Sequence, residues 1–98
     1  MLHIVNRSPL SSNSLDAVDR FARSGAVLLI EDAVYAATRG NAAAEKITAM
    51  SSRLKVYALG PDLEARGVAD RLIDGVSTVD YEGFVDLVAE HPNCQSWL

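Results

Sequence analysis

Two adjacent acids follow the most apolar stretch of the chain. After Gly25, residues 26–30 form an unbroken apolar run that Glu31 and Asp32 end. Such a run is typical of a strand buried on both faces of a parallel sheet, and open α/β sheets receive ligands and partners beyond the carboxyl ends of their strands. Glu31 and Asp32 are therefore candidate site residues. The alternative is that Asp32 caps the helix that follows, with Glu31 in solvent beside it.

Cys94 is the single cysteine of the chain. An exposed thiolate can accept sulfur as a persulfide when a positive group or a helix N-terminus lowers the pKa of its thiol. Cys94 follows the C-terminal end of the last predicted helix, which is the wrong end of the helix dipole for this effect. We therefore expect an inert cysteine in the C-terminal tail and keep Cys94 only as a weak catalytic candidate.

Other catalytic and ligand-binding patterns are missing from the sequence. The first turn between a predicted strand and helix, residues 7–14, contains no glycine, which argues against a phosphate-binding loop. His3 lies in a predicted strand and His91 stands beside Pro92, with no nucleophile elbow in the sequence to form a Ser-His-Asp triad. His and Cys residues form no cluster at metal-ligand spacing. We expect neither a cofactor nor a metal.

Length and charge limit the class of protein. With 98 residues the chain is expected to form one domain over residues 1–98. Its net charge of -4 argues against direct binding of nucleic acid, because such binding needs a basic surface that displaces counterions. No apolar run approaches the ~20 residues that cross a bilayer, and no targeting segment is recognisable. We therefore expect a cytoplasmic protein.

The elements expected to position these residues alternate along the chain. Strands are predicted at residues 1–6, 25–30, 55–59 and 76–79, and helices at 15–23, 33–38, 42–50, 61–67 and 81–90. Connections of this length predict an α/β fold: a single-domain, three-layer open parallel sheet of four to five strands with helices on both faces. Gly25 is expected to end the first helix and Asp80 to cap the last. The expected core-facing residues are Leu15, Val18, Phe21 and Ala22 in the first helix, and Tyr81, Phe84, Val85 and Val88 in the last.

Several apolar side chains have no obvious place in such a small core. Val34 and Tyr35 come directly after the acidic end of the central strand, and Trp97 and Leu98 follow the end of the last helix. Exposed apolar patches usually mark interfaces. We therefore add these four residues to Glu31 and Asp32 as partner-interface candidates. The alternative for Trp97 is that the tail folds back and packs the indole on its own sheet.

Seven segments, in this order along the chain, resemble one known family. They are Met1-Leu2-His3, Arg7-Ser8-Pro9, residues 28–37, residues 55–59, residues 62–67, residues 79–85 and the closing Trp97. Together they resemble the DsrH/TusB family of sulfur-relay proteins along the whole chain. The resemblance implies the DsrE/DsrF-like fold and a hexamer with two homologous partner types, TusC/DsrF and TusD/DsrE, each chain present in two copies. It also implies downstream proteins that accept the sulfur, and it leaves self-association of the isolated chain open.

The resemblance also implies a function. In the TusB branch the complex relays persulfide sulfur toward 2-thiolation of the wobble uridine of tRNA, through a cysteine of the TusD-type partner. Members of the DsrH branch serve sulfur oxidation and carry a cysteine in an Asn-Ser-Leu-x-x-Cys run, where this chain has Val18 after Asn13-Ser14-Leu15. We therefore expect a structural, non-catalytic subunit for tRNA thiolation. The alternatives are a sulfur-oxidation subunit, an autonomous sulfur carrier using Cys94, and a regulatory module that binds a small ligand beside Glu31 and Asp32.

Overall fold

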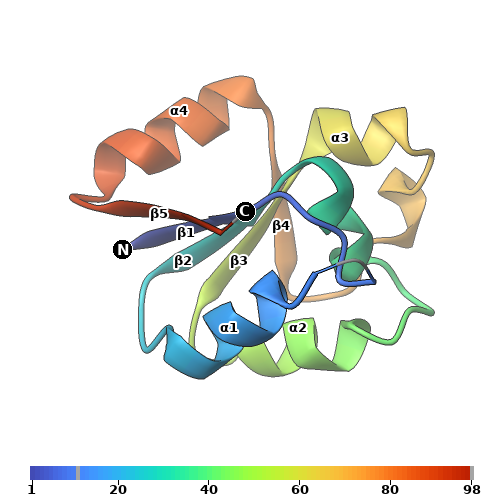
Figure 1. Ribbon diagram of the computed structural model, residues 1–98. Coiled ribbons are helices and arrows are strands. Elements are labelled where there is room, and N and C mark those ends of the chain that lie inside the picture. Colours follow the sequence, from blue (N-terminus) through green and yellow to red (C-terminus); the bar gives the residue numbers. More distant parts are fainter. Residues whose placement is uncertain (11, 98) are drawn as a thin grey trace.

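Five parallel strands form the centre of the protein. The computed structural model describes residues 1–10 and 12–97. The strands are β1 (Leu2–Val5), β2 (Ala26–Leu29), β3 (Lys55–Leu59), β4 (Val76–Val79) and β5 (Cys94–Trp97). They lie in the order β4-β3-β2-β1-β5, and each neighbouring pair is parallel (Figure 1). The α/β fold predicted from the sequence is confirmed.

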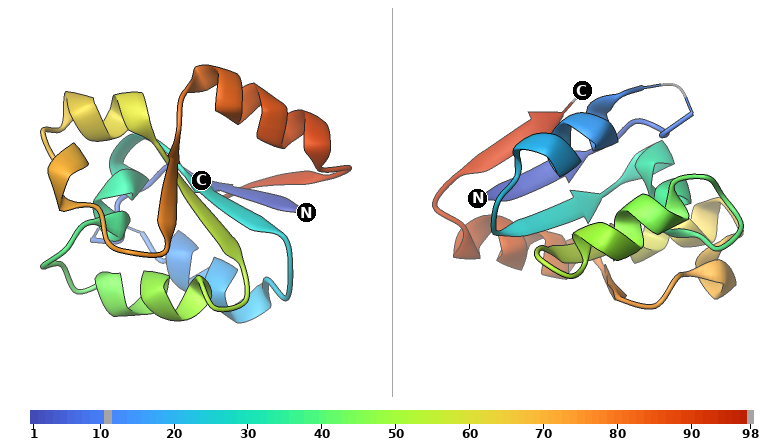
Figure 2. Two further views of the ribbon diagram at one scale, coloured as in Figure 1. Left: turned by 180° about the vertical axis from the view of Figure 1, so that it is seen from behind. Right: turned by 90° about the horizontal axis from the view of Figure 1, so that it is seen from below.

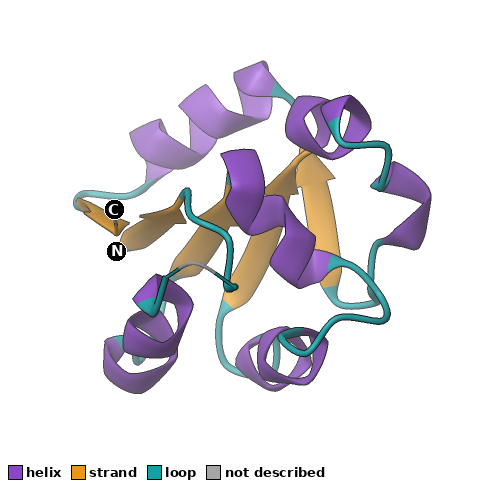
Figure 3. Ribbon diagram, turned by 45° about the vertical axis from the view of Figure 1, so that its right-hand side comes forward, coloured by secondary structure: helices purple, strands orange, loops and turns teal. Residues whose placement is uncertain are grey.

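The helices connect these strands and cover the sheet. They are α1 (Ser14–Phe21), α2 (Ala44–Met50), α3 (Gly60–Ala65) and α4 (Tyr81–Glu90), with 3₁₀ helices η1 (Glu31–Ala37) and η2 (Ala69–Arg71). From β1 to β4 the strands are added in one direction, and right-handed crossovers then place α1 and α2 on the same face. The connection from β4 to β5 returns past the whole sheet, so α4 lies on the opposite face (Figure 3).

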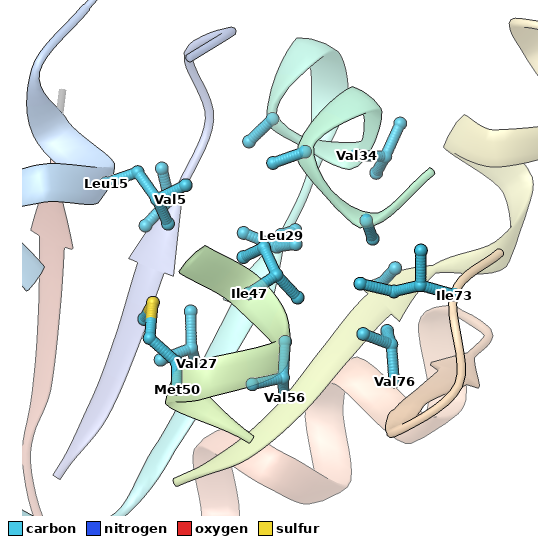
Figure 4. Close-up of a cluster of buried hydrophobic side chains, with 14 of the residues drawn as sticks. Val5, Leu15, Val27, Leu29, Val34, Ile47, Met50, Val56, Ile73 and Val76 are labelled. Atoms are coloured by element: carbon cyan, nitrogen blue, oxygen red, sulfur yellow. The ribbon is translucent and has the colours of Figure 1, made fainter. Parts of the chain in front are cut away.

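The larger core lies between the sheet and helices α1 and α2. In Figure 4, Ile47 and Met50 of α2 lie over Val27 and Val56 of the sheet. All four side chains are buried, as are Leu15 and Val18 of α1 and Ala22, the residue that follows it. Phe21 is 67% exposed, so its predicted core position is wrong. The helix ends at Phe21, and its buried residues that contact the core are Leu15 and Val18.

The opposite face of the sheet has a smaller core, which packs against α4. Here Leu2, Ala26 and Leu28 pack with Leu87 of α4, and Phe84 is partly buried beside them. The expected core face of α4 is largely wrong. Tyr81, Val85 and Val88 are exposed, because the helix is turned so that Leu87 and Phe84 point to the sheet. Asp80 does cap α4 as predicted, since its carboxylate accepts a 2.7 Å hydrogen bond from the Gly83 N–H.

The tail after α4 is an edge strand rather than a loose end. Residues 94–97 pair with β1 in parallel register, Leu2 opposite Cys94 and Val5 opposite Trp97. In the right-hand view of Figure 2, β5, β1 and β2 lie side by side. The predicted helix at residues 33–38 is instead the 3₁₀ helix η1, which begins at Glu31 and ends at Ala37, and the 3₁₀ helix η2 was not predicted. No helix in the described part of the chain has the length and apolar character needed to span a membrane.

Gly25 has a different role from the expected helix stop. The C-cap of α1 is Ala22, whereas Gly25 lies immediately before β2 with φ +104°. A Cβ atom there would lie 2.2 Å from the carbonyl oxygen of Met1, which itself accepts a hydrogen bond from the Ala26 N–H. Glycine is therefore required where the chain enters the central strand beside the start of β1.

We predict that Gly25→Ala destabilises the protein more than Gly67→Ala. Both glycines have positive φ, which costs an L-residue about 1–2 kcal/mol. A Cβ at Gly67 meets nothing within 4 Å, so this matched control lacks the collision with Met1. Urea unfolding of the two variants measures the difference. Equal losses of unfolding free energy would show that the approach to Met1 is unimportant.

Candidate functional site

Glu31 begins η1 in a strained backbone conformation at the carboxyl end of β2. Its φ is 51°, the one positive φ of a non-glycine residue among residues 1–10 and 12–97. Its N–H donates a 2.6 Å hydrogen bond to Oδ2 of Asp62. Left-handed conformations of this kind persist only where neighbouring contacts hold them. Asp62, from the first turn of α3, supplies that contact here.

Asp32 forms an ion pair and does not cap η1. The capping position is occupied by Ile30. Oδ1 of Asp32 accepts hydrogen bonds from Nε and Nη2 of Arg66, at 3.0 and 2.9 Å. The same guanidinium donates through Nη1 to the Asp62 carbonyl oxygen at 3.2 Å. Arg66 thus links η1 to the end of α3.

The structure therefore joins the two predicted acids to two residues that the sequence reasoning missed. The missed residues are Asp62 and Arg66, whose i,i+4 spacing on a predicted helix was the available signal. Asp32 has 61% of its side chain exposed, so its ion pair contributes little to stability. The geometry is that of a cluster that holds two segments together. The Asp32 carboxylate is engaged by Arg66, and the Asp62 carboxylate by the Glu31 N–H.

Tyr35 lies beside this cluster and lines a hollow of about 200 Å³. The hollow is mainly apolar, with Pro9, Leu10 and Ala42 among its lining residues. Tyr35 is 39% exposed, which agrees with the expectation that the core does not fully cover it. Val34 is completely buried in the larger core, so the expectation that it has no place there is wrong. η1 turns Val34 inward because Ala33, Ala36 and Ala37 leave room against the sheet.

Asn41 is a further residue of this region that the sequence reasoning missed. Its Nδ2 donates to the carbonyl oxygens of Tyr35 and Thr38, and its Oδ1 accepts a 2.6 Å bond from the Ala43 N–H. It thereby connects the end of η1 to the start of α2. One buried acceptor at the same edge, Oδ1 of Asn6, has no hydrogen-bond partner in the part of the chain that the structure describes.

Trp97 packs on its own sheet, as the alternative reading of the tail required. The indole is partly buried against the larger core, and its Nε1 donates a 3.1 Å hydrogen bond to Nδ1 of His3. His3 is only 6% exposed. Burial lowers the pKa of His3 below its usual value, and the nearby N-terminal ammonium group lowers it further. Leu98 lies outside the described residues.

Cys94 lies far from the acids. It is exposed and starts β5 opposite Leu2, which places it at the amino edge of the sheet. Glu31 and Asp32 lie at the carboxyl edge, roughly four residues or 13 Å along the strand direction. No hydrogen bond or ion pair joins the Cys94 side chain to another described residue, and none of these residues form a group of three or more potential metal ligands. The two candidate sites are therefore separate.

Comparisons with known proteins identify the family. A family model described as "DsrH like protein" matches residues 7–94. The chain belongs to the DsrH/TusB family. The proteins named Protein TusB from Escherichia coli K12 and Pectobacterium parmentieri are 34% and 37% identical to it, over 99% of this chain and 100% of each relative. The family resemblance found in the sequence is confirmed.

Solved structures resemble this DsrH-family chain in fold. The ychN protein from E. coli has a TM-score of 0.77 at 23% identity, covering 97% of both chains. A protein of unknown function from Methanobacterium thermoautotrophicum has a TM-score of 0.70 at 16% identity, covering 97% of this chain and 95% of its own. Within the family-matched region, Val18 is fully buried in α1. The first-helix position discussed above is thus a core position in this chain.

We predict that the unfolding free energy falls as the pH is lowered below about 6.5, the usual pKa of histidine. The pKa of His3 is lower in the folded chain than in the unfolded chain, so the unfolded chain binds a proton more readily. Acidification therefore stabilises the unfolded state relative to the folded state. The slope can approach about 1.4 kcal/mol per pH unit for one proton. Urea unfolding between pH 5 and pH 8 measures it.

His3→Asn is expected to reduce this slope, because it removes the group whose pKa is lowered in the folded chain. The comparison concerns the pH dependence and not the absolute stability, so a destabilised His3 variant remains informative. An unchanged slope in His3→Asn would contradict the assignment.

Proposed function

We propose that this chain is a structural, non-catalytic subunit of a cytoplasmic sulfur-relay complex that serves 2-thiolation of the wobble uridine of tRNA. The complex also contains homologous subunits of the TusC/DsrF and TusD/DsrE types and passes sulfur to downstream acceptor proteins. The observation that carries the proposal is the position of the single thiol. Cys94 is on an exposed edge strand, at the opposite edge from the charged cluster, with no cation bonded to it in the described structure.

Two further observations favour this reading over direct catalysis. The carboxylates of Asp32 and Asp62 are engaged by Arg66 and by the Glu31 N–H, so they are occupied in holding η1 and α3. The full-length relatives compared above carry the name TusB, which favours the tRNA branch. The net charge of -4 supports an arrangement in which a partner holds the tRNA.

Sulfur oxidation is the second candidate function, because the family model that matches the chain is described as DsrH like. Against it stands Val18, a buried valine at the first-helix position where the DsrH branch is expected to carry cysteine. A sulfur carrier acting through Cys94 is the third, favoured by the exposure of that thiol. Genetic and chemical experiments separate the three.

Deletion of the gene is predicted to lower the 2-thiouridine content of bulk tRNA strongly, and the wild-type gene on a plasmid is predicted to restore it. The reason is that a complex without one of its subunits does not assemble its relay path. Mass spectrometry of tRNA nucleosides gives the measurement. Normal thiolation together with lost growth on reduced sulfur would favour the oxidation pathway instead.

Cys94→Ser is predicted to restore thiolation as well as the wild-type chain does, because the proposal gives this thiol no part in the relay. The substitution is conservative in size and lies on an exposed strand, so the fold should tolerate it. As a direct check, the wild-type chain is incubated with a persulfide donor and its intact mass is measured by mass spectrometry. Stoichiometric sulfur on Cys94 that transfers onward would support the carrier function and contradict the proposal.

A further inference from the structure

The face of the sheet that carries α4 is only half covered. Five strands about 4.8 Å apart give a sheet roughly 19 Å wide, whereas a helix with its side chains is about 10 Å across. Ile4, Ile30 and Tyr57 on this side remain partly exposed beside α4. On the other face lie α1 and α2 (Figure 3). The side chains of the sheet that face these two helices are buried.

The helix itself exposes an apolar stripe. Tyr81, Val85 and Val88 are spaced by four and three residues, so they share one side of α4. They are 60%, 66% and 40% exposed, respectively. Leu87 and Phe84 supply the contact with the sheet, so the stripe is not needed for the fold of this chain. An exposed apolar stripe of this kind is typical of a surface that a partner covers.

Acidic residues run beside the stripe along the same helix. Glu82, Asp86 and Glu90 follow one another at four-residue intervals, one position away from Tyr81 and Val85, and all three are exposed. Acidic and basic residues are unevenly distributed along the sequence. After Arg71 the chain contains five acidic residues and no lysine or arginine, whereas the first 71 residues contain nine basic and eight acidic ones.

From this pattern we infer that the stripe of Tyr81, Val85 and Val88 is the docking site for a partner subunit whose contact surface is apolar and bordered by lysine and arginine. The inference rests on the proposed function, since it takes the partner to be one of the two homologous subunits of the complex. A basic border on the partner would be complementary in charge to Glu82, Asp86 and Glu90. This complementarity speeds the association of the two subunits and fixes their relative alignment. The apolar stripe supplies the apolar surface that becomes buried when the partner binds.

A second copy of this chain fits the same surface poorly. A symmetric dimer through α4 brings the same residues of both copies together. Glu82, Asp86 and Glu90 would then face their own counterparts, and Lys55, which lines a hollow with Glu90, offsets part of this charge at the Glu90 end. Like charges placed opposite one another oppose association. The charge pattern therefore favours a different, basic chain over self-association on this face.

The test uses this chain co-expressed with its two homologous partner subunits. Asp86→Lys with Glu90→Lys is expected to weaken association at least tenfold, and Val85→Ser with Val88→Ser to weaken it similarly. The matched charge control is Glu45→Lys with Asp74→Lys, which makes the same change in net charge at exposed positions away from α4. The matched apolar control is Phe21→Ser on α1. Both controls should bind within about twofold of the wild type.

Binding is measured by pull-down and light scattering at low and high salt, after circular dichroism has shown that each variant is folded. Loss in both α4 variants, with wild-type binding that weakens as salt rises, supports the inference. Wild-type-like binding by the α4 variants overturns it and leaves the proposed function standing. A dimer of the isolated chain that Val85→Ser with Val88→Ser dissociates also overturns it. Failure of the wild-type chain to bind either subunit contradicts the proposed function, and the inference falls with it.

Discussion

The fold depends on the burial of β2. All four of its residues, Ala26 to Leu29, are at most 1% exposed, because β1 and β3 pair with its two edges and side chains cover both of its faces. A strand in this position sends alternate residues into opposite cores. Val27 and Leu29 enter the larger core and Ala26 and Leu28 the smaller one. Gly25 allows the chain to enter β2 so close to Met1 that β1 can pair with it from its first residues.

Elements with a strong pattern were predictable from the sequence. The apolar run of β2, the Asp80 cap and the helix predicted at residues 61–67 each have a local physical cause, and the structure has the corresponding elements. Other features depend on tertiary contacts. The periodicity of α4 makes both the Leu87 side and the Val85 side apolar, and only the orientation over the sheet decides which is buried. The strand at residues 94–97 has no apolar alternation and forms because β1 offers a free edge.

The candidate site was predictable only in part for the same reason. The position of Glu31 and Asp32 after a buried strand correctly places them at the carboxyl edge. Their partners Asp62 and Arg66 come from α3, more than thirty residues later, and nothing near the acids in sequence indicates them. In the resulting cluster Arg66 pairs with Asp32, and the Asp62 carboxylate accepts a hydrogen bond from the Glu31 N–H. A group of ionised side chains that bond to one another and to the backbone is well suited to fixing η1 on α3, and poorly suited to proton transfer or nucleophilic attack.

The two faces of the sheet differ in a way that bears on the role of the chain. The face with α1 and α2 holds most of the core, including Ile47 and Met50, and Phe21 of α1 is exposed beside it. The α4 face has a few buried residues, an exposed apolar stripe and a row of acids. A chain of this length has little interior to spare, so covering both faces equally would need more residues than it has. The charged cluster holds η1 on α3, whereas the α4 face leaves an apolar stripe and a row of acids exposed.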